Sequence, residues 1–463
     1  MKRRKILFVS YFYPPAAGMA LPGTQRSLKF VRHLEKLDKF ILTVQPDAYP
    51  EYFKMNHPAI LPVAGEKIFR TGVFDFFQFL VACKNKLFLR RNESPAEDEA
   101  TLPAAKQSDV KGSNGQRNGF FQKFKDIISE ILTYPDAANC WIFPAVRAGR
   151  GIIREEGIDY IFATGKPWSA LIVASFIKKA GVKLVVDFRD PWVNNPFERE
   201  LSEFRKKVDR YLEKKVVRKA DWVFLNTEYL RQEFIGRYGQ EYKDKFITVT
   251  NGFDENDFQS NVSGVKKINN PDDDSSKLVL THAGLLYGLR DPISIFQAFA
   301  KCYQIVGEDI ARNIKLRQVG GIDLGYNFQQ YIHENCSDEN FEDMGQVPYS
   351  ECLGLLSNSD ILLIIQPDTK TQIPSKLYEY IYLNKPILTI APKDGALGKM
   401  IKKYGFGDIY NPEDIEGIAQ YFAEKFLEKK KNGTLFCEYQ NREEFNVKNI
   451  TAKFEKLLLE GVQ

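Results

Sequence analysis

Short apolar runs alternate with stretches of helical spacing along most of the chain, and the alternation forms two blocks. In the first block, apolar runs predict buried strands over residues 5–10, 40–44, 158–163, 183–187, 222–225 and 246–250. In the second block, they predict strands over residues 278–282, 314–319, 360–365, 387–390 and 405–409. Strands that alternate with amphipathic helices form parallel sheets whose two faces are both covered. The pattern therefore predicts an α/β protein with two Rossmann-like lobes that face a central cleft.

A polar, turn-rich stretch between the two blocks, residues 262–277, is typical of an interdomain linker. We therefore expect an N-terminal lobe over residues 1–262 and a C-terminal lobe over residues 275–463. The N-terminal lobe carries an insertion around residues 66–134, because much of this region is polar and rich in turn-forming residues. The last predicted helix, residues 447–459, is expected to pack back on the N-terminal lobe.

Residues 373–390 predict a short helix that is followed directly by a buried strand. Pro374 ends the segment before the helix, and Ser375 suits the N-cap position. Apolar residues then recur at helical spacing from Leu377 onward. Asn384 suits the left-handed conformation that ends a helix, and the strand begins three residues later.

The beginning of this helix carries the clearest candidate chemistry in the chain. The free N–H groups of a helix N-terminus favour an anion such as phosphate. Lys376 adds a positive charge there, and Glu379 places a carboxylate one turn further along. Any helix–strand unit of an α/β protein can have this composition, so other parts of the chain must decide between a phosphate site and an ordinary structural unit.

Several loops follow predicted strands, and ligands bind at the carboxyl ends of strands in doubly wound sheets. A loop rich in Gly and Pro that contains Gly18 follows the first strand, and residues 164–169 follow the strand at 158–163. Arg189 and Asp190 follow the next strand, where they could bind a sugar or an acceptor group, or form a salt bridge that shapes their own loop. The first glycine loop lacks the GxGxxG spacing, so a nicotinamide cofactor is not expected.

Composition narrows the class of protein. The chain has 463 residues, of which 44% are hydrophobic and 27% are charged, and these values are ordinary for a globular protein. Its net charge of +5 is too small to indicate nucleic-acid binding. No apolar run is long enough for a transmembrane helix, and the short run after the basic N-terminus does not match a signal peptide. We therefore predict a cytoplasmic protein.

The sequence indicates neither a metal site nor a redox site. The six cysteines form no CxxC pair, so we expect reduced thiols. The four histidines are far apart in the sequence, which argues against a metal centre. An acidic run, Asp272 to Asp274, lies within the polar linker and is interpreted as a solvated loop. We therefore expect no metal and no cofactor.

An aromatic and basic region leaves contact with a membrane open. Residues 69–91 combine a cluster of phenylalanines with Lys and Arg, and residues 120–132 predict an amphipathic helix. Such segments most often belong to the core of a protein, which is the interpretation we favour for most of this region. The alternative is peripheral contact with the inner face of an anionic membrane.

Five blocks, in order along the chain, resemble family 4 of the retaining GT-B glycosyltransferases, of the type found in bacterial surface-polysaccharide pathways. They are the YFYPP loop with Gly18, the Tyr-Pro-Asp segment at 134–136 together with DFRDPW at 187–192, the NGFD turn at 251–254, the glycine loop at 284–292, and IPSKLYEY at 373–380. The resemblance covers nearly the whole chain outside residues 50–130. The shared order of the five blocks carries it, since no single block is specific.

The resemblance implies a nucleotide-diphosphate sugar as donor, a glycan or lipid-linked acceptor, and transfer on the front face of the sugar without a metal. The donor-binding residues that it implies are Gly284, Leu285, Arg290, Thr371, Pro374, Ser375, Lys376, Leu377 and Glu379. Among these, Arg290 and Lys376 would stabilise the leaving diphosphate, and Glu379 would accept hydrogen bonds from the ribose. Gly18, Arg189 and Asp190 would lie on the side of the acceptor and the sugar.

The sequence departs from the family pattern at two donor positions. The family has two glutamates separated by seven residues, and Glu379 matches the second, whereas Thr371 occupies the first position. Leu285 falls where the family carries an arginine. Two other functions therefore stay open, namely a catalytically inert nucleotide- or sugar-binding partner in polysaccharide assembly and a GT-B nucleotide-sugar epimerase. An epimerase needs acid and base residues, and the scarcity of histidine in the cleft loops argues against it.

Overall fold

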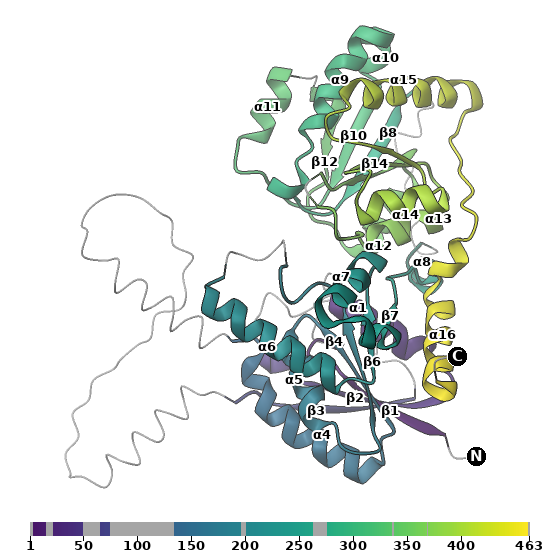
Figure 1. Ribbon diagram of the computed structural model, residues 1–463. Helices are drawn as coiled ribbons and strands as arrows, with labels where there is room; N and C mark the ends of the chain where they lie inside the picture. Colours follow the sequence, from purple (N-terminus) through teal and green to yellow (C-terminus); the bar gives the residue numbers. More distant parts are fainter. Residues whose placement is uncertain are drawn as a thin grey trace, which may run out of the picture.

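A computed structural model describes residues 3–14, 22–49, 65–74, 134–195, 201–262, 276–335, 338–367 and 369–461. These residues form two lobes, each built on a parallel sheet with helices on both faces (Figure 1). The predicted α/β architecture with two Rossmann-like lobes is confirmed. Gly18, the acidic run at 272–274 and the predicted helix at 120–132 lie outside the described residues. Among the described residues, no helix combines the length and apolar character needed to cross a bilayer.

The N-terminal lobe contains a seven-stranded sheet in the order β3-β2-β1-β4-β5-β6-β7, in which every neighbouring pair is parallel. Its strands are β1 (Arg4–Val9), β2 (Leu37–Val44), β3 (Glu66–Thr71), β4 (Tyr160–Gly165), β5 (Lys183–Phe188), β6 (Trp222–Leu225) and β7 (Phe246–Thr248). Its helices are α1 (Pro22–His33), α4 (Ile142–Glu156), α5 (Trp168–Ile177), α6 (Glu203–Lys219) and α7 (Glu228–Tyr238).

The apolar runs of this sheet are continuous because helices cover both faces. On β1, Ile6 and Phe8 belong to the core beneath α1, whereas Leu7 and Val9 belong to the core beneath α4 and α5. Successive side chains of a strand point to opposite faces, so a strand that is buried on both sides shows no polar alternation.

The C-terminal lobe contains a six-stranded parallel sheet in the order β12-β10-β8-β13-β14-β15. Its strands are β8 (Leu278–Ala283), β10 (Ile314–Val319), β12 (Phe341–Asp343), β13 (Ile361–Ile365), β14 (Ile387–Ile390) and β15 (Asp408–Tyr410), and β9 (Leu286–Tyr287) pairs with β11 (Ile322–Asp323) separately. Its helices are α9 (Ile293–Val306), α10 (Glu308–Ala311), α11 (Phe328–Asn335), α12 (Tyr349–Ser357), α13 (Lys376–Leu383), α14 (Ala396–Tyr404) and α15 (Ile415–Asn432).

The sequence analysis missed β3, α4 and α7 in the N-terminal lobe. β3 lies at the edge of the sheet, where it pairs with β2 and is only partly buried. Partly buried positions accept polar residues, so the sequence of β3 lacks the apolar run that predicts a strand. The buried face of α4 includes Ala145 and Gly149, which are small and weaken its apolar stripe. α6 begins at Glu203, because Ser202 caps it by accepting a hydrogen bond from the Arg205 amide.

The chain crosses between the lobes twice, and the two crossings pair with each other. The amide of Phe253 donates to the carbonyl of Phe445 over 3.0 Å, and the amide of Val447 donates to the carbonyl of Phe253 over 2.9 Å. Helix α8 (Glu255–Val262) follows the first crossing and packs against α12. The final helix, α16 (Val447–Glu460), follows the second and packs against α1, where the rings of Phe30 and Phe454 lie 5.6 Å apart (Figure 1).

Gly252 allows this close pairing of the two crossings, and Gly252→Ala should lower the stability of the protein. A Cβ at this position would overlap the carbonyl oxygen of Phe445 and approach Ile450 to 2.9 Å. Overpacking of this kind costs about 1–3 kcal/mol, which should be visible as a lower midpoint of thermal unfolding. Gly236→Ala in α7 is the control, because no atom lies near the added methyl group there. An equal midpoint for both variants would show that the crossings adjust without strain.

Candidate functional site

The order of the strands places two loops of the C-terminal lobe side by side. β8 lies at the point where the strand order reverses, with β10 on one side and β13 on the other. The loop after β8 begins at Gly284, and the segment after β13 leads to α13. Ligands in doubly wound folds bind at such a switch point, because the connections leave the sheet in opposite directions and open a crevice there.

The loop after β8 is held closely against the next strand connection. Gly284 has a φ of +144°, a conformation that favours glycine, and its amide donates to the Val319 carbonyl over 2.8 Å. A Cβ on the neighbouring Gly320 would overlap the Gly284 carbonyl, so neither position accepts a side chain readily. Leu285 is exposed on this loop, and the Arg290 guanidinium lies 5.5 Å from the centre of the Tyr287 ring.

His282 is a buried residue beneath this loop that the sequence analysis did not select. Its Nδ1 lies 2.7 Å from Oε1 of Gln318, whose Nε2 donates to the Gly284 carbonyl over 2.7 Å. Since Gln318 uses its amide group as a donor to Gly284, its oxygen accepts the proton of His282 Nδ1. Burial and the positive charges of Arg290 and Lys376 lower the pKa of His282 to about 4. The imidazole is therefore neutral at pH 7 and helps to hold the loop in place.

The segment after β13 forms the predicted short helix and strand. α13 begins at Lys376 and ends at Asn384, which has the predicted left-handed conformation with a φ of +53°. Ser375 is the N-cap residue, as predicted, but it has helical backbone angles and its side chain accepts no capping hydrogen bond. The amides of Leu377 and Tyr378 instead donate to the carbonyls of Pro374 and Ser375, each over 3.1 Å. This tight first turn makes a side-chain cap unnecessary.

The first turn of α13 presents an ion pair. Nζ of Lys376 lies 2.8 Å from one carboxylate oxygen of Glu379, and the Tyr349 hydroxyl donates to the other over 3.3 Å. Burial alone would lower the pKa of Lys376, but the carboxylate of Glu379 outweighs it, so the pKa is raised and the amine stays charged. Burial beside Glu379 also raises the pKa of the Tyr349 hydroxyl.

The two loops thus bring their charged residues toward one place. Both Arg290 and Lys376 act electrostatically on His282, and Arg290 also acts on Tyr380 of α13. The predicted donor residues therefore share one region at the carboxyl ends of β8 and β13. A free α13 N-terminus, two cations and one carboxylate suit a ligand that combines negative charge with hydroxyl groups.

The two lobes touch each other beside this region. Nε2 of Gln372 donates to Asp190 over 2.9 Å, and the Thr227 hydroxyl lies 3.5 Å from the carbonyl oxygen of Thr371. Oγ1 of Thr371 is buried and has no hydrogen-bond partner among the residues that the structure describes. The carboxyl edges of the two sheets therefore meet at the segment before α13.

Asp190 and Arg189 have different positions, although they are adjacent in the sequence. Asp190 lies at the contact between the lobes, whereas Arg189 is only 8% exposed. The Arg189 side chain donates to the carbonyls of Gly165 and Lys166 and to the Thr164 hydroxyl, over 2.9, 2.5 and 3.1 Å. The guanidinium of Arg189 therefore holds the loop after β4 in place. Its role beside an acceptor or a sugar stays a prediction.

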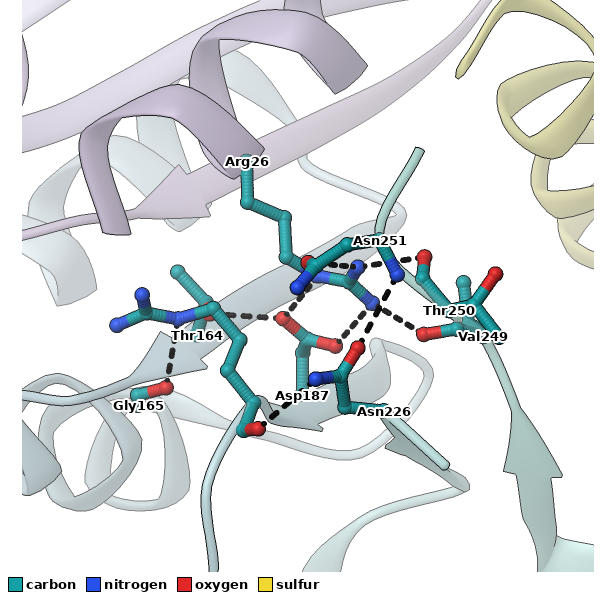
Figure 2. A network of polar contacts seen from close by, with 9 residues as sticks. Arg26, Thr164, Gly165, Asp187, Asn226, Val249, Thr250 and Asn251 are labelled. Carbon is teal, nitrogen blue, oxygen red and sulfur yellow. Dashed lines mark hydrogen bonds and ion pairs between the residues drawn. The ribbon is translucent and has the colours of Figure 1, made fainter. Parts of the chain in front are cut away.

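A buried network at the carboxyl edge of the N-terminal sheet was also not predicted (Figure 2). Arg26, from the first turns of α1, forms two parallel 2.8 Å hydrogen bonds with Asp187 at the end of β5. It also donates to the carbonyls of Val249 and Thr250 over 2.7 and 2.8 Å. The Thr164 hydroxyl donates to Asp187 over 2.7 Å. The network therefore ties α1, β4 and β5 to the start of the first crossing.

This network extends toward the candidate site through Thr250. Thr250 and Arg26 both act on the hydroxyl of Tyr378 in α13, whose pKa is raised by burial. A signal for the network was present in the sequence, since an aspartate at the end of an apolar strand needs a buried partner. The sequence did not show which of the many arginines would supply it.

No group of three or more metal-ligating side chains occurs in the part of the chain that the structure describes. The cations Arg290 and Lys376 can balance negative charge beside the first turn of α13. The site as described therefore suits an anion that is held by amides and side-chain cations.

Comparison with known proteins agrees with this architecture. Residues 132–252 match the model of the glycosyl transferase 4-like domain. The solved structures that resemble the whole chain include Anabaena HepE in complex with UDP and glucose, with a TM-score of 0.56, 13% identity, and coverage of 99% of this chain and 100% of HepE. The fold is GT-B.

Two other GT-B neighbours match over nearly their full length. Sucrose-phosphate synthase from Thermosynechococcus elongatus has a TM-score of 0.55 and 13% identity, with 99% of each chain covered. The lipopolysaccharide outer core galactosyltransferase WaaB has a TM-score of 0.53 and 11% identity, with 99% of this chain and 100% of WaaB covered. No curated protein gives a significant match by sequence. At these identities the structural matches establish the fold, and the domain match covers residues 132–252 of the N-terminal lobe.

Proposed function

We propose that the protein is a retaining glycosyltransferase that moves a sugar from a nucleotide-diphosphate sugar to a glycan or lipid-linked acceptor. The observation that carries the proposal is the placement of Arg290, Lys376 and the α13 N-terminus around the carboxyl ends of β8 and β13. The matched glycosyl transferase 4-like domain and the GT-B neighbours, among them one crystallised with UDP-glucose, support it. The retaining outcome and the polysaccharide context rest on the sequence resemblance.

In this proposal the cations stabilise the leaving diphosphate. The amides of Ser375 and Lys376 have no backbone acceptor among the described residues, so they can donate to phosphate oxygens. Lys376 already lies beside Glu379, and its flexible side chain can contact both the carboxylate and a phosphate. Charge that develops on the departing phosphate is stabilised by groups fixed before the reaction, which is usually the largest contribution to catalysis.

Glu379 would accept hydrogen bonds from the ribose hydroxyls, as the resemblance implies. Its pairing with Lys376 and Tyr349 holds the carboxylate in a defined orientation before a donor binds. Pro374, Ser375 and Leu377 would fix the tight turn, and Gly284 and Leu285 would form the opposite wall. The departing phosphate would take the proton of the acceptor hydroxyl, so no separate general base is required. The site would close when the lobes approach and exclude water.

Thr371 motivates the second candidate, a catalytically inert module that binds a nucleotide or a sugar. Thr371 occupies the position of the first family glutamate, and its buried hydroxyl has no described hydrogen-bond partner. An inert module would bind the nucleotide without consuming a donor. The third candidate, an epimerase, gains no support from His282, because its pKa of about 4 leaves it unable to act as an acid near pH 7.

The deciding experiment is thermal unfolding with UDP, GDP, ADP and their sugars, each with and without a chelator. A ligand present at 100 times its dissociation constant should add about 2.7 kcal/mol to stability. We expect one base to stabilise the protein selectively, without need of a metal, and the variants Arg290→Ala and Glu379→Ala to lose the effect. Consumption of the stabilising donor then separates the transferase from the inert module.

Two results would count against the proposal. If no nucleotide stabilises a protein that is shown to be folded, the donor site assigned here is wrong. If stabilisation appears and the Arg290→Ala variant retains it in full, the nucleotide binds elsewhere. An exposed arginine far from the site provides the matched control, and Arg312→Ala in the C-terminal lobe should keep the whole shift because its partner is the nearby Glu308.

A further inference from the structure

Three neighbouring helices of the N-terminal lobe form one layer over the sheet. α4 packs against α5, and α5 packs against α6 (Figure 1). Their inner sides supply Ile152, Ala170 and Val216 to the core on this face of the sheet. Their outer sides therefore form one continuous surface that points away from the sheet.

This outer surface carries exposed aromatic side chains on each of its helices. Phe143 of α4 is 66% exposed, Phe176 of α5 is 53% exposed, and Phe204 of α6 is 71% exposed. Tyr211, also on α6, is exposed as well. Of the four exposed phenylalanines among the described residues, three lie on this layer, and the fourth, Phe436, lies in the other lobe. Apolar side chains concentrated in this way indicate an interaction site.

Basic residues surround these aromatic side chains and follow the helical repeat. On α4, Arg147, Arg150 and Arg154 continue the stripe that begins at Phe143, at spacings of four, three and four residues. On α6, the exposed basic residues are Lys207, Arg210, Lys214, Lys215, Arg218 and Lys219. We call the nine basic residues, together with Phe143, Phe176, Phe204 and Tyr211, the basic–aromatic face.

The acidic residues of these helices hardly reduce this charge. Asp209 and Glu213 of α6 are buried and pair with Trp192, Arg205 and Arg237. The fully exposed acidic residues of the three helices are Glu155 and Glu203. The basic–aromatic face thus has a net charge of about +7 when both are included, whereas the whole chain has +5. Among the described residues, this surface therefore carries a local excess of positive charge.

We propose that the basic–aromatic face docks the protein on an anionic membrane surface. The basic side chains would approach lipid phosphates while the rings enter the interface. The sequence left such contact open as an alternative for residues 69–91 and 120–132, which lie mostly outside the described residues, whereas the proposed contact lies on α4, α5 and α6. A lipid surface fits better than a nucleic acid, because the rings stand on separate helices and form no stacking groove. The proposal does not depend on the proposed function.

The test is sedimentation of the full chain with vesicles of phosphatidylcholine, with and without phosphatidylglycerol. We expect binding that requires the anionic lipid and weakens with salt. The variant Phe204→Ala/Lys207→Glu/Lys214→Glu should reduce binding by at least about tenfold. The matched control, Leu427→Ala/Lys430→Glu/Lys431→Glu on α15, also removes one exposed apolar side chain and reverses two exposed lysines, and it should bind as the wild type does.

A charge-neutral variant separates a membrane from other polyanions. Phe143→Ala/Phe204→Ala leaves the charge unchanged and should still lower vesicle binding severalfold, because two exposed rings no longer enter the interface. If this variant binds vesicles normally, or if single-stranded nucleic acid binds as tightly and depends on the same residues, membrane docking is wrong. It is also wrong if the wild type does not sediment, or if the α15 control loses binding to the same extent.

Discussion

Replacement of Lys376 by alanine should weaken the binding of a nucleoside diphosphate by about 10- to 100-fold. The variant removes a positive charge from the first turn of α13. In the wild type, Lys376, Arg290 and the described amides would together balance the charge of the two phosphates. It also leaves the partly buried carboxylate of Glu379 without its cation, so repulsion of the ligand adds to the loss of affinity.

The rate of transfer from the donor should fall by at least about 100-fold in the same variant, because the charge of the leaving group grows during the reaction. Calorimetric titration with the stabilising nucleotide measures the first effect.

The structure offers a closely matched control for Lys376. Lys425 pairs with Glu428 on α15 at the same sequence separation and the same 2.8 Å distance, and it lies far from α13 in the lobe. Lys425→Ala should therefore leave nucleotide affinity unchanged. Equal affinities for the Lys376→Ala variant and the wild type, with both proteins folded, would remove Lys376 from the donor site.

Replacement of Arg26 by alanine should destabilise the protein by about 3–5 kcal/mol, the largest stability effect that we expect from one substitution. The Arg26 side chain is 5% exposed and that of Asp187 is not exposed, so the variant leaves a buried carboxylate uncompensated. It also removes the donor that satisfies the carbonyls of Val249 and Thr250. Because Arg26 and Thr250 both influence Tyr378 of α13, nucleotide binding at α13 should weaken as well.

Thermal and denaturant unfolding measure this effect, and a second variant keeps the prediction testable if Arg26→Ala does not fold. Asp187→Asn retains the size of the side chain and removes the charge, so it should also destabilise the protein, by a smaller amount. Arg154→Ala is the control, because its side chain is 77% exposed and its ion pair with Glu155 contributes at most about 1 kcal/mol. A loss for Arg26→Ala no larger than for Arg154→Ala would show that water replaces the network without cost.

The periodicity of the sequence was sufficient to predict the α/β architecture and the short helix of the candidate site. β6, β10 and β14 have the predicted bounds, because buried parallel strands leave strong local patterns. The left-handed residue at Asn384 was likewise predicted, since the conformation depends on one residue type. β3 and α4 were missed because an edge strand and a helix that packs through small residues leave weak patterns.

The sequence by itself thus determined the two lobes, the short helix α13, and the residue types Lys376 and Glu379 one turn apart. The tertiary structure alone decided which side chains meet. It turned Arg189 inward to hold the loop after β4, joined Arg26 to Asp187 across 161 residues, and placed His282 beneath the glycine loop. It also aligned α4, α5 and α6 into one charged surface. Local patterns specify helices and strands, but partners distant in sequence depend on the order of the strands, which no local pattern encodes.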